Sequence, residues 1–83
     1  MERRELGIAV VGSGRLGTLR ASLAAAHPAV RFLAVSDADI ARARALAEKV
    51  GAQFWSGDNL EVIARSEVNA VIVSTSEIGR AHV

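Results

Sequence analysis

Three glycines near the start of the chain have a spacing that could hold a phosphate group. Gly12, Gly14 and Gly17 form the pattern G-x-G-x-x-G, between a run of small apolar residues and a helix-like pattern. A glycine-rich turn that enters a helix leaves backbone N–H groups unpaired, and the helix dipole favours negative charge at the same place. Gly12 would allow a tight turn, Gly14 would let a pyrophosphate approach, and Gly17 would let the helix lie close to a sheet. The alternative is that these glycines serve only turn geometry and helix packing.

A carboxylate lies where a dinucleotide-binding fold places an acid against the adenosine ribose. Asp37 ends the second apolar run, 20 residues after Gly17. A carboxylate at this position repels the extra phosphate of NADP, so NAD is the expected cofactor, and NADP is the alternative if Arg42 or Arg44 reaches back. Ordinary turn chemistry is the other interpretation of this stretch, with Asp39 as a helix cap and Asp37 solvated.

The remaining candidates lie in two places, within the glycine motif and after the fourth apolar run. Arg15 could reach the pyrophosphate, although an arginine at the start of an exposed helix is usually solvated. Ser74, Thr75 and Ser76 come where ligands bind in open α/β sheets, and simple turn formation is their alternative. No catalytic residue and no metal ligand is predicted. The predicted cofactor-binding residues are Gly12, Ser13, Gly14, Arg15, Leu16, Gly17, Asp37, Ser74 and Thr75.

The elements that must position these residues alternate along the chain. Strands are expected at residues 6–12, 30–37, 53–56 and 69–75. Helices are expected at residues 15–26, at residues 40–50 and after Asp58. Continuous apolar runs are typical of strands covered on both faces of a parallel sheet. The alternation predicts an α/β, Rossmann-type parallel sheet of four strands in the order 3-2-1-4, with helices on both faces.

Local signals set the faces and the ends of the helices. In the first helix, Leu16, Leu19 and Leu23 recur at helical spacing, and His27 before Pro28 closes it. The inward residues expected of the second helix are Ile40, Ala43, Ala47 and Val50.

The second and third helices also carry recognisable caps. Asp39 can cap the second helix and Gly51 can stop it. Asp58 and Glu61 form a variant of the capping box at the start of the third helix. Trp55, on the short third strand, is expected in the core, and its alternative is a place beside adenine.

Length and composition limit what the chain can be. Its 83 residues allow one small domain, which rules out a complete two-domain enzyme. The net charge is +1 with the charges scattered, so no nucleic-acid surface is expected. The absence of cysteine excludes disulfides, a cysteine-zinc site and a thiol nucleophile. The apolar run after the charged start is too short for a signal peptide, so we expect a cytoplasmic protein without a membrane segment.

Residues 6–76 resemble the N-terminal half of the nucleotide-binding domain of the Gfo/Idh/MocA oxidoreductases. The resemblance is carried by the glycine motif with Arg15, by "HP", by "DAD" with "ARARALAE", and by "VNAVIVST". It implies a parent enzyme that uses NAD or NADP to transfer hydride to or from a carbonyl or alcohol carbon, commonly of a sugar or cyclitol. The residues that it places at the cofactor are Gly12, Gly14 and Gly17 at the pyrophosphate, Asp37 at the ribose, and Ser74 and Thr75 nearby.

The chain departs from this family at its end. Ser76 stands where the family usually has proline, and Arg80 stands where it has histidine. The family's Glu-Lys-Pro motif and its C-terminal substrate domain with the catalytic histidine are absent. We therefore expect an incomplete dinucleotide-binding domain, residues 1–83, without turnover of its own. Its partners would be the dinucleotide and, for the parent, a sugar-like substrate and a second subunit, with no nucleic acid or membrane.

The last seven residues, "EIGRAHV", can be read back as the start of a widely used sequencing adapter. The interpretation is that residues 77–83 are not native, and the alternative is a native helix start. Two other functions remain open: a non-catalytic NAD-sensing regulatory domain, and a methyltransferase, which also uses a glycine-rich turn and an acid after the second strand.

Overall fold

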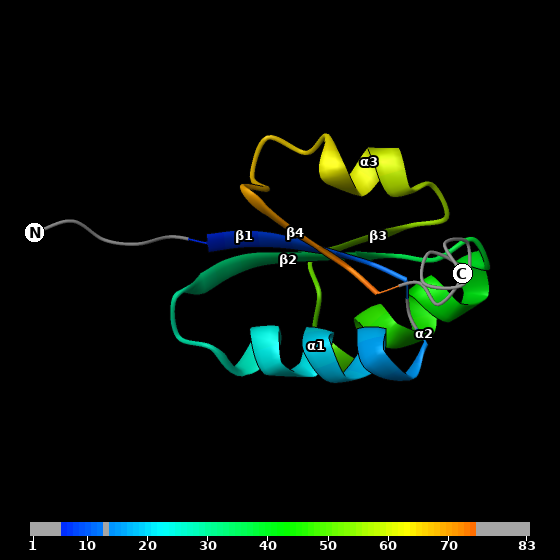
Figure 1. Ribbon diagram of the computed structural model, residues 1–83, viewed down its shortest axis with the longest axis horizontal. Coiled ribbons are helices and arrows are strands. Elements are labelled where there is room, and N and C mark those ends of the chain that lie inside the picture. Colours follow the sequence, from blue (N-terminus) through cyan, green and yellow to red (C-terminus); the bar gives the residue numbers. More distant parts are fainter. Residues whose placement is uncertain (1–5, 13, 75–83) are drawn as a thin grey trace, which may run out of the picture.

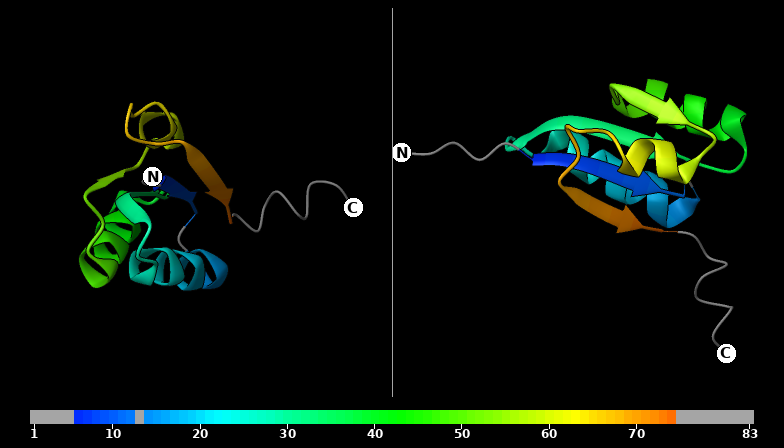
Figure 2. Two further views of the ribbon diagram at one scale, coloured as in Figure 1. Left: turned by 90° about the vertical axis from the view of Figure 1, so that its left-hand side faces the viewer. Right: turned by 90° about the horizontal axis from the view of Figure 1, so that it is seen from above.

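A computed structural model describes residues 6–12 and 14–74 of the chain. These residues form a three-layer α/β fold, in which α1 and α2 cover one face of the sheet and α3 covers the other (Figures 1 and 2). The parallel sheet has the order β3-β2-β1-β4, as predicted. The strands are β1 (Leu6–Val11), β2 (Val30–Ser36), β3 (Phe54–Ser56) and β4 (Ala70–Val73). The helices are α1 (Arg15–Ala26), α2 (Ile40–Val50) and α3 (Asn59–Ile63).

The register of the strands brings their carboxyl ends to one edge of the sheet. Val11 at the end of β1 lies opposite Ser36 of β2 and Val73 of β4. Ser36 in turn lies opposite Ser56 of β3. The loops that leave these four strands therefore meet at the same edge, which is where ligands bind in open parallel sheets.

The core consists of two apolar layers on either side of the sheet. The layer under α1 and α2 contains Ile8, Val10, Ala21, Ala24, Leu33, Val35, Leu46 and Ala47. The layer under α3 contains Ala9, Val11, Ala34 and Val62. Successive residues of β1 enter opposite layers, as the two-residue repeat of a strand requires. The central strands are therefore covered on both faces, as their continuous apolar sequences predicted.

The buried face of α1 is made of small residues. Gly17, Ala21 and Ala24 are buried. The leucines whose spacing indicated this helix lie elsewhere, because Leu16, Leu19 and Leu23 are 54, 53 and 63% exposed. Small residues allow the helix axis to lie close to the sheet, and the larger leucines would hold it away. The leucine spacing thus predicted the helix correctly but does not mark its buried face.

The caps predicted for α2 are confirmed, and its buried face is partly different. The Asp39 carboxylate accepts a hydrogen bond from the N–H of Ala41, and Gly51 ends the helix with a φ of 76°. Ala43 and Ala47 are buried as expected, but Leu46 is buried with them. Ile40 was predicted wrongly, because it is 56% exposed in the first turn. Val50 is half-buried.

The start of α3 is held by a relay of hydrogen bonds. Asp58 caps the helix by accepting from the N–H of Leu60, at 2.9 Å. The Glu61 carboxylate accepts from the Ser56 hydroxyl at 2.5 Å, and that hydroxyl accepts from the N–H of Asp58 at 2.9 Å. The predicted capping box is therefore closed through Ser56. On the same side of the sheet, the Ser36 hydroxyl donates to Asn59 Oδ1 at 2.7 Å.

Both outer strands carry exposed apolar side chains. Trp55 on β3 is 37% exposed, so its predicted place in the core is wrong. On β4, Val71 and Val73 are 42 and 49% exposed. Within the described residues each of these strands pairs on one side only, β3 with β2 and β4 with β1. An apolar strand with an unpaired edge is a site of self-association.

Val71→Lys is expected to slow the self-association of the chain. A lysine on an edge strand repels a second copy and does not disturb the buried layers. Light scattering during incubation at fixed concentration measures the effect. The control is Leu60→Lys, which adds the same charge at a 71% exposed apolar residue of α3, away from any strand edge. Equal slowing by both variants, or a wild-type chain that stays monomeric and unfolds reversibly, would contradict this prediction.

Candidate functional site

The turn between β1 and α1 requires one glycine for its backbone conformation. Gly12 has a φ of 98°, which side-chain-bearing residues rarely adopt. Its N–H donates to the carbonyl of Ser36 on the neighbouring strand, at 2.8 Å. The turn therefore begins in register with the end of β2, and the predicted role of Gly12 in a tight turn is confirmed.

A second glycine is required by close packing. A Cβ on Gly17 would lie 1.8 Å from the carbonyl oxygen of Gly12 and 3.6 Å from the Cβ of Ser74. The first turn of α1 thus rests directly on the backbone that leaves β1. This confirms that Gly17 lets the helix lie close to the sheet.

Gly14, the third glycine, is required neither by its backbone conformation nor by close packing. Gly14 is the N-cap of α1, has an ordinary φ of −68°, and makes no side-chain cap. A Cβ at Gly14 would meet no atom of the other described residues within 4 Å. The interpretation that all three glycines serve only turn geometry and packing therefore accounts for Gly12 and Gly17 but not for Gly14. The open space at Gly14 lies at the N-terminus of a twelve-residue helix, where backbone N–H groups lack intrahelical partners.

A buried hydroxyl lies beside this turn. The N–H of Ser74 donates to the carbonyl of Val11 at 2.8 Å, which continues the pairing of β4 with β1. The Ser74 side-chain oxygen is buried and has no hydrogen-bond partner among the described residues. A buried hydroxyl without a hydrogen-bond partner costs free energy, so a ligand group that forms a hydrogen bond with the Ser74 hydroxyl would be stabilised here. Ser13 and Thr75, which were predicted with it, lie outside the described residues.

Asp37 follows β2 at the same edge. Its N–H donates to the carbonyl of Ser56 at 3.3 Å, and its Oδ1 accepts from the N–H of Asp39 at 2.8 Å. The turn chemistry that the sequence left open is therefore present. Each carboxylate oxygen can accept more than one hydrogen bond, so taking part in the turn does not prevent the side chain from accepting bonds from ligand hydroxyls. The turn also fixes the side chain at the edge that carries Gly12 and Ser74.

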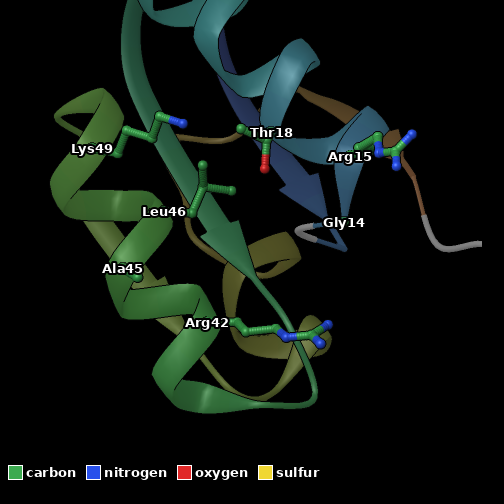
Figure 3. Close-up of a pocket in the computed structure, with 7 residues that line it drawn as sticks. All are labelled: Gly14, Arg15, Thr18, Arg42, Ala45, Leu46 and Lys49. Atoms are coloured by element: carbon green, nitrogen blue, oxygen red, sulfur yellow. The ribbon is translucent and has the colours of Figure 1, made fainter.

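A cationic groove runs between α1 and α2 (Figure 3). Its volume is about 540 Å³. The residues that line it are Gly14, Arg15, Thr18, Arg42, Ala45, Leu46 and Lys49. The side chains of Arg42 and Lys49 extend from α2 toward α1, the Thr18 hydroxyl faces the space between them, and Arg15 extends away from α2. None of the described residues that line the groove is a carboxylate.

A second hollow lies away from the glycine turn. It has a volume of about 330 Å³. It is lined by Ile40, Ala41, Arg44, Ala45, Glu48 and Trp55, none of which is a predicted site residue. Arg44 and Glu48 form an ion pair at 3.2 Å over it. Trp55 therefore lies beside residues of α2 and not beside the predicted cofactor-binding residues.

A carboxyl group with a lowered pKa, that of Glu67, lies far from the glycine turn in the chain. A backbone hydrogen bond and the Arg65 guanidinium hold the pKa of the exposed Glu67 carboxyl below its usual range. Arg65 also lies 4.4 Å from the ring centre of Phe54 and 5.7 Å from that of Phe32, near the starts of their strands. Arg65 and Glu67, with the two phenylalanine rings, therefore have a structural role.

Within residues 6–12 and 14–74, no group of three histidine, cysteine or acidic side chains could hold a metal ion. In the same part of the chain, no helix is long and apolar enough to cross a membrane.

The groove was not predicted from the sequence. Thr18 and Lys49 were not singled out, and Arg42 was considered only for NADP. A signal was nevertheless present, because Arg42 and Lys49 are seven residues apart and so share one face of α2. The sequence did not indicate which face of α1 lies opposite Arg42 and Lys49.

Comparison with known proteins gives a consistent set of relatives. Residues 6–83 match the family model described as "Oxidoreductase family, NAD-binding Rossmann fold". An inositol 2-dehydrogenase of Rubrobacter xylanophilus is 31% identical over 92% of this chain and 22% of its own length. A scyllo-inositol 2-dehydrogenase (NAD(+)) of Bacillus subtilis is 37% identical over 81% of this chain and 20% of its own length. The chain thus spans about a fifth of the length of these relatives.

Solved structures show the same fold. The crystal structure of GenD2 from gentamicin A biosynthesis, in complex with NAD, has a TM-score of 0.78 and 35% identity over 87% of this chain and 20% of its own. Myo-inositol dehydrogenase from Lactobacillus casei, in complex with NAD(H) and myo-inositol, has a TM-score of 0.76 over 86% of this chain and 22% of its own. At 19% identity it supports the fold alone. By sequence and by fold, this chain belongs to the Gfo/Idh/MocA oxidoreductase family and has its NAD-binding Rossmann fold.

Proposed function

We propose that the glycine turn of this chain binds the pyrophosphate of NAD, and that the chain is the cofactor-binding part of an oxidoreductase. The observation that carries this proposal is Gly14, a glycine that neither its own backbone angles nor its protein neighbours require. Its missing Cβ leaves space at the helix N-terminus, where an anion is stabilised. A pyrophosphate in that space would account for the residue.

The neighbouring residues fit the rest of the ADP portion. The first N–H groups of α1 would donate to the phosphate oxygens. The Ser74 hydroxyl would gain in the dinucleotide the partner that it lacks among the described residues. Asp37 would accept hydrogen bonds from the adenosine ribose hydroxyls. Ser13 and Thr75 are proposed contacts from their place in the sequence, as are Arg15 and Leu16 in the first turn of α1.

We also propose that this chain is part of a longer parent protein, and we infer the reaction of that parent from the relatives. Bound NAD supplies a nicotinamide that accepts or donates hydride. We propose that the parent transfers hydride at a carbonyl or alcohol carbon of a cyclitol or sugar, because both curated relatives are named as inositol dehydrogenases. The contribution of this chain is to bind and orient the ADP end of the cofactor, and we propose no catalytic residue in it. A cytoplasmic location stays a prediction.

Calorimetric titration of the chain with NAD tests the proposal. Binding of NAD, and not of S-adenosylmethionine, is expected if the glycine turn holds a pyrophosphate. No reduction of NAD is expected when myo-inositol is added, because we propose no catalytic residue in this chain. Preference for S-adenosylmethionine would instead support a methyltransferase. Failure to bind NAD by a chain that circular dichroism shows to be folded would overturn the proposal.

Asp37→Ala is expected to weaken NAD more than NADP. The substitution removes charge-assisted hydrogen bonds to ribose hydroxyls, a loss of roughly tenfold or more in affinity for NAD. It also removes the charge that repels the extra phosphate of NADP. Asp37→Asn is the companion variant, because its amide oxygen can keep the turn with Asp39 while the charge is lost. Equal weakening of both cofactors, or none, measured by the same titration, would count against the role of Asp37.

A further inference from the structure

Two serines are buried side by side at the carboxyl edge of the sheet. Ser36 ends β2, Ser56 ends β3, both are buried, and they lie opposite one another in the register. Among the described residues that are buried as a whole, no other is polar. A buried hydroxyl costs free energy unless it is hydrogen-bonded, so packing alone would favour apolar residues at both positions. The hydroxyls must therefore be explained by what they bind.

Both hydroxyls have their partners in the cap and first turn of α3. The Ser36 hydroxyl donates to Asn59 Oδ1 at 2.7 Å. The Ser56 hydroxyl donates to the Glu61 carboxylate at 2.5 Å and accepts from the N–H of Asp58 at 2.9 Å. This helix covers the face of the sheet opposite α1 and α2 (Figure 1). It supplies no residue to the proposed cofactor site, yet it fixes both serines.

The two serines adjoin the backbone of Asp37. Ser36 precedes Asp37 in the chain, and the Ser56 carbonyl accepts from the N–H of Asp37 at 3.3 Å, which is longer than usual for such a bond. A hydrogen bond of this length is weak, so the place of the Asp37 backbone depends on how firmly both serines are held. The Ser36 carbonyl also accepts from the N–H of Gly12 at 2.8 Å, which joins the same set of bonds to the glycine turn.

We infer that Glu61 and Asn59 are positioning residues for Asp37. Through Ser56 and Ser36 they hold the backbone that carries its carboxylate, and so they raise the affinity for NAD without touching the cofactor. A binding group has to lie within about 0.5 Å of its productive position, so movement of this backbone would lose hydrogen bonds to the ribose. The inference rests on the proposed role of Asp37 in binding the ribose.

Glu61→Ala and Glu61→Gln test the inference by calorimetric titration with NAD. Both variants remove the charge, but only glutamine keeps an oxygen that can accept from the Ser56 hydroxyl. Glu61→Ala is expected to weaken NAD about three- to tenfold, the worth of one hydrogen bond, and Glu61→Gln should stay within about twofold of the wild-type chain. In a chain that carries Asp37→Ala, adding Glu61→Ala should change NAD affinity by less than about twofold, because the residue that it positions is gone.

Further variants separate positioning from loss of stability. Val62→Ala removes buried apolar volume from α3 and leaves the hydrogen bonds of Ser36 and Ser56 in place, so it should lower the unfolding midpoint without changing NAD affinity. Circular dichroism checks that each variant is folded. If Glu61→Ala does not fold, Asn59→Ala takes its place, with Asn59→Asp as the variant that keeps an acceptor for Ser36.

Amide hydrogen exchange of the chain without NAD gives a second readout. The N–H of Asp37 should exchange about three- to tenfold faster in Glu61→Ala than in Glu61→Gln, because its acceptor is the Ser56 carbonyl. The N–H of Gln53, which donates to the Leu33 carbonyl just before β3 begins, should exchange at the same rate in both variants.

Each outcome supports the inference or removes it. NAD affinity that falls in Glu61→Ala only while Asp37 is present, and is restored in Glu61→Gln, supports it. NAD affinity that Glu61→Ala leaves unchanged, or that falls equally with and without Asp37 or in both variants of Glu61, would overturn it and leave the proposed function standing. If the wild-type chain does not bind NAD, the proposed function fails, and exchange at Asp37 alone decides whether α3 positions this residue.

Discussion

Replacing Gly14 by aspartate is expected to abolish NAD binding while leaving the chain at least as stable as before. Aspartate is a strong N-cap residue, and Gly14 is an N-cap without a side-chain hydrogen bond. Its carboxylate would satisfy an N–H of the first turn and would face the positive end of the dipole, for a gain of up to about 1 kcal/mol. Nothing within 4 Å of the new Cβ opposes it.

The same carboxylate would occupy the position proposed for the pyrophosphate. Two like charges about 4 Å apart, at an effective dielectric constant of about 20, repel by about 4 kcal/mol, which is close to a thousandfold in affinity. A loss of more than about a hundredfold in NAD affinity is therefore expected, with a thermal midpoint that is unchanged or higher. Calorimetric titration and thermal unfolding measure the two effects.

The control for Gly14→Asp adds the same charge elsewhere. Ser66→Asp lies in the exposed turn between α3 and β4 and should leave NAD binding unchanged within about twofold. If Gly14→Asp binds NAD as the wild-type chain does, the glycine turn is not the pyrophosphate site. A large loss of stability would show instead that Gly14 has a structural role that its surroundings do not reveal.

Gly17→Ala is expected to destabilise or unfold the chain. Alanine favours a helix over glycine by about 1 kcal/mol, so propensity alone predicts a gain. That gain is outweighed because the new Cβ would lie 1.8 Å from the backbone oxygen of Gly12, and a backbone atom cannot turn aside as a side chain can. Overpacking of this kind costs about 1–3 kcal/mol and occasionally more. A net loss of about 2 kcal/mol would lower the midpoint of a domain of this size by roughly 8–16 °C.

Gly14→Ala is the matched control, since it makes the same substitution three residues earlier in the chain. Its Cβ meets open space, so its unfolding midpoint should stay close to that of the wild-type chain while its NAD affinity falls. Thermal unfolding followed by circular dichroism compares the two variants. Equal midpoints for Gly17→Ala and the wild-type chain would contradict the close packing of α1 on the turn.

The sequence predicted the parts of the fold that depend on local signals. The strands and their order followed from apolar runs that alternate with helical patterns, and the caps of α2 followed from Asp39 and Gly51. These features depend on residues that are close together in the chain. The glycine turn was predictable for the same reason, because its three glycines lie within six residues.

Features that depend on how the elements face one another were not predictable. The leucines of α1 gave a helical repeat, but small residues form its buried face because the helix lies so close to the sheet. Trp55 was expected inside because of its size, yet β3 is an outer strand with one described neighbour. The groove needs the relative rotation of two helices, which no spacing within either helix specifies.

The small-residue face of α1 has a consequence for how binding and folding are linked. Gly17, Ala21 and Ala24 remove little apolar surface from water, so this helix adds modestly to the stability of a domain whose size already limits its core. A ligand at the N-terminus of α1 then becomes a substantial part of what keeps the helix in place. Because NAD would bind only the folded chain, a concentration of about one hundred times its dissociation constant would add about 2.7 kcal/mol to the free energy of unfolding. The cofactor would then act also as a folding ligand, and the folded fraction of the chain would vary with the amount of dinucleotide around it.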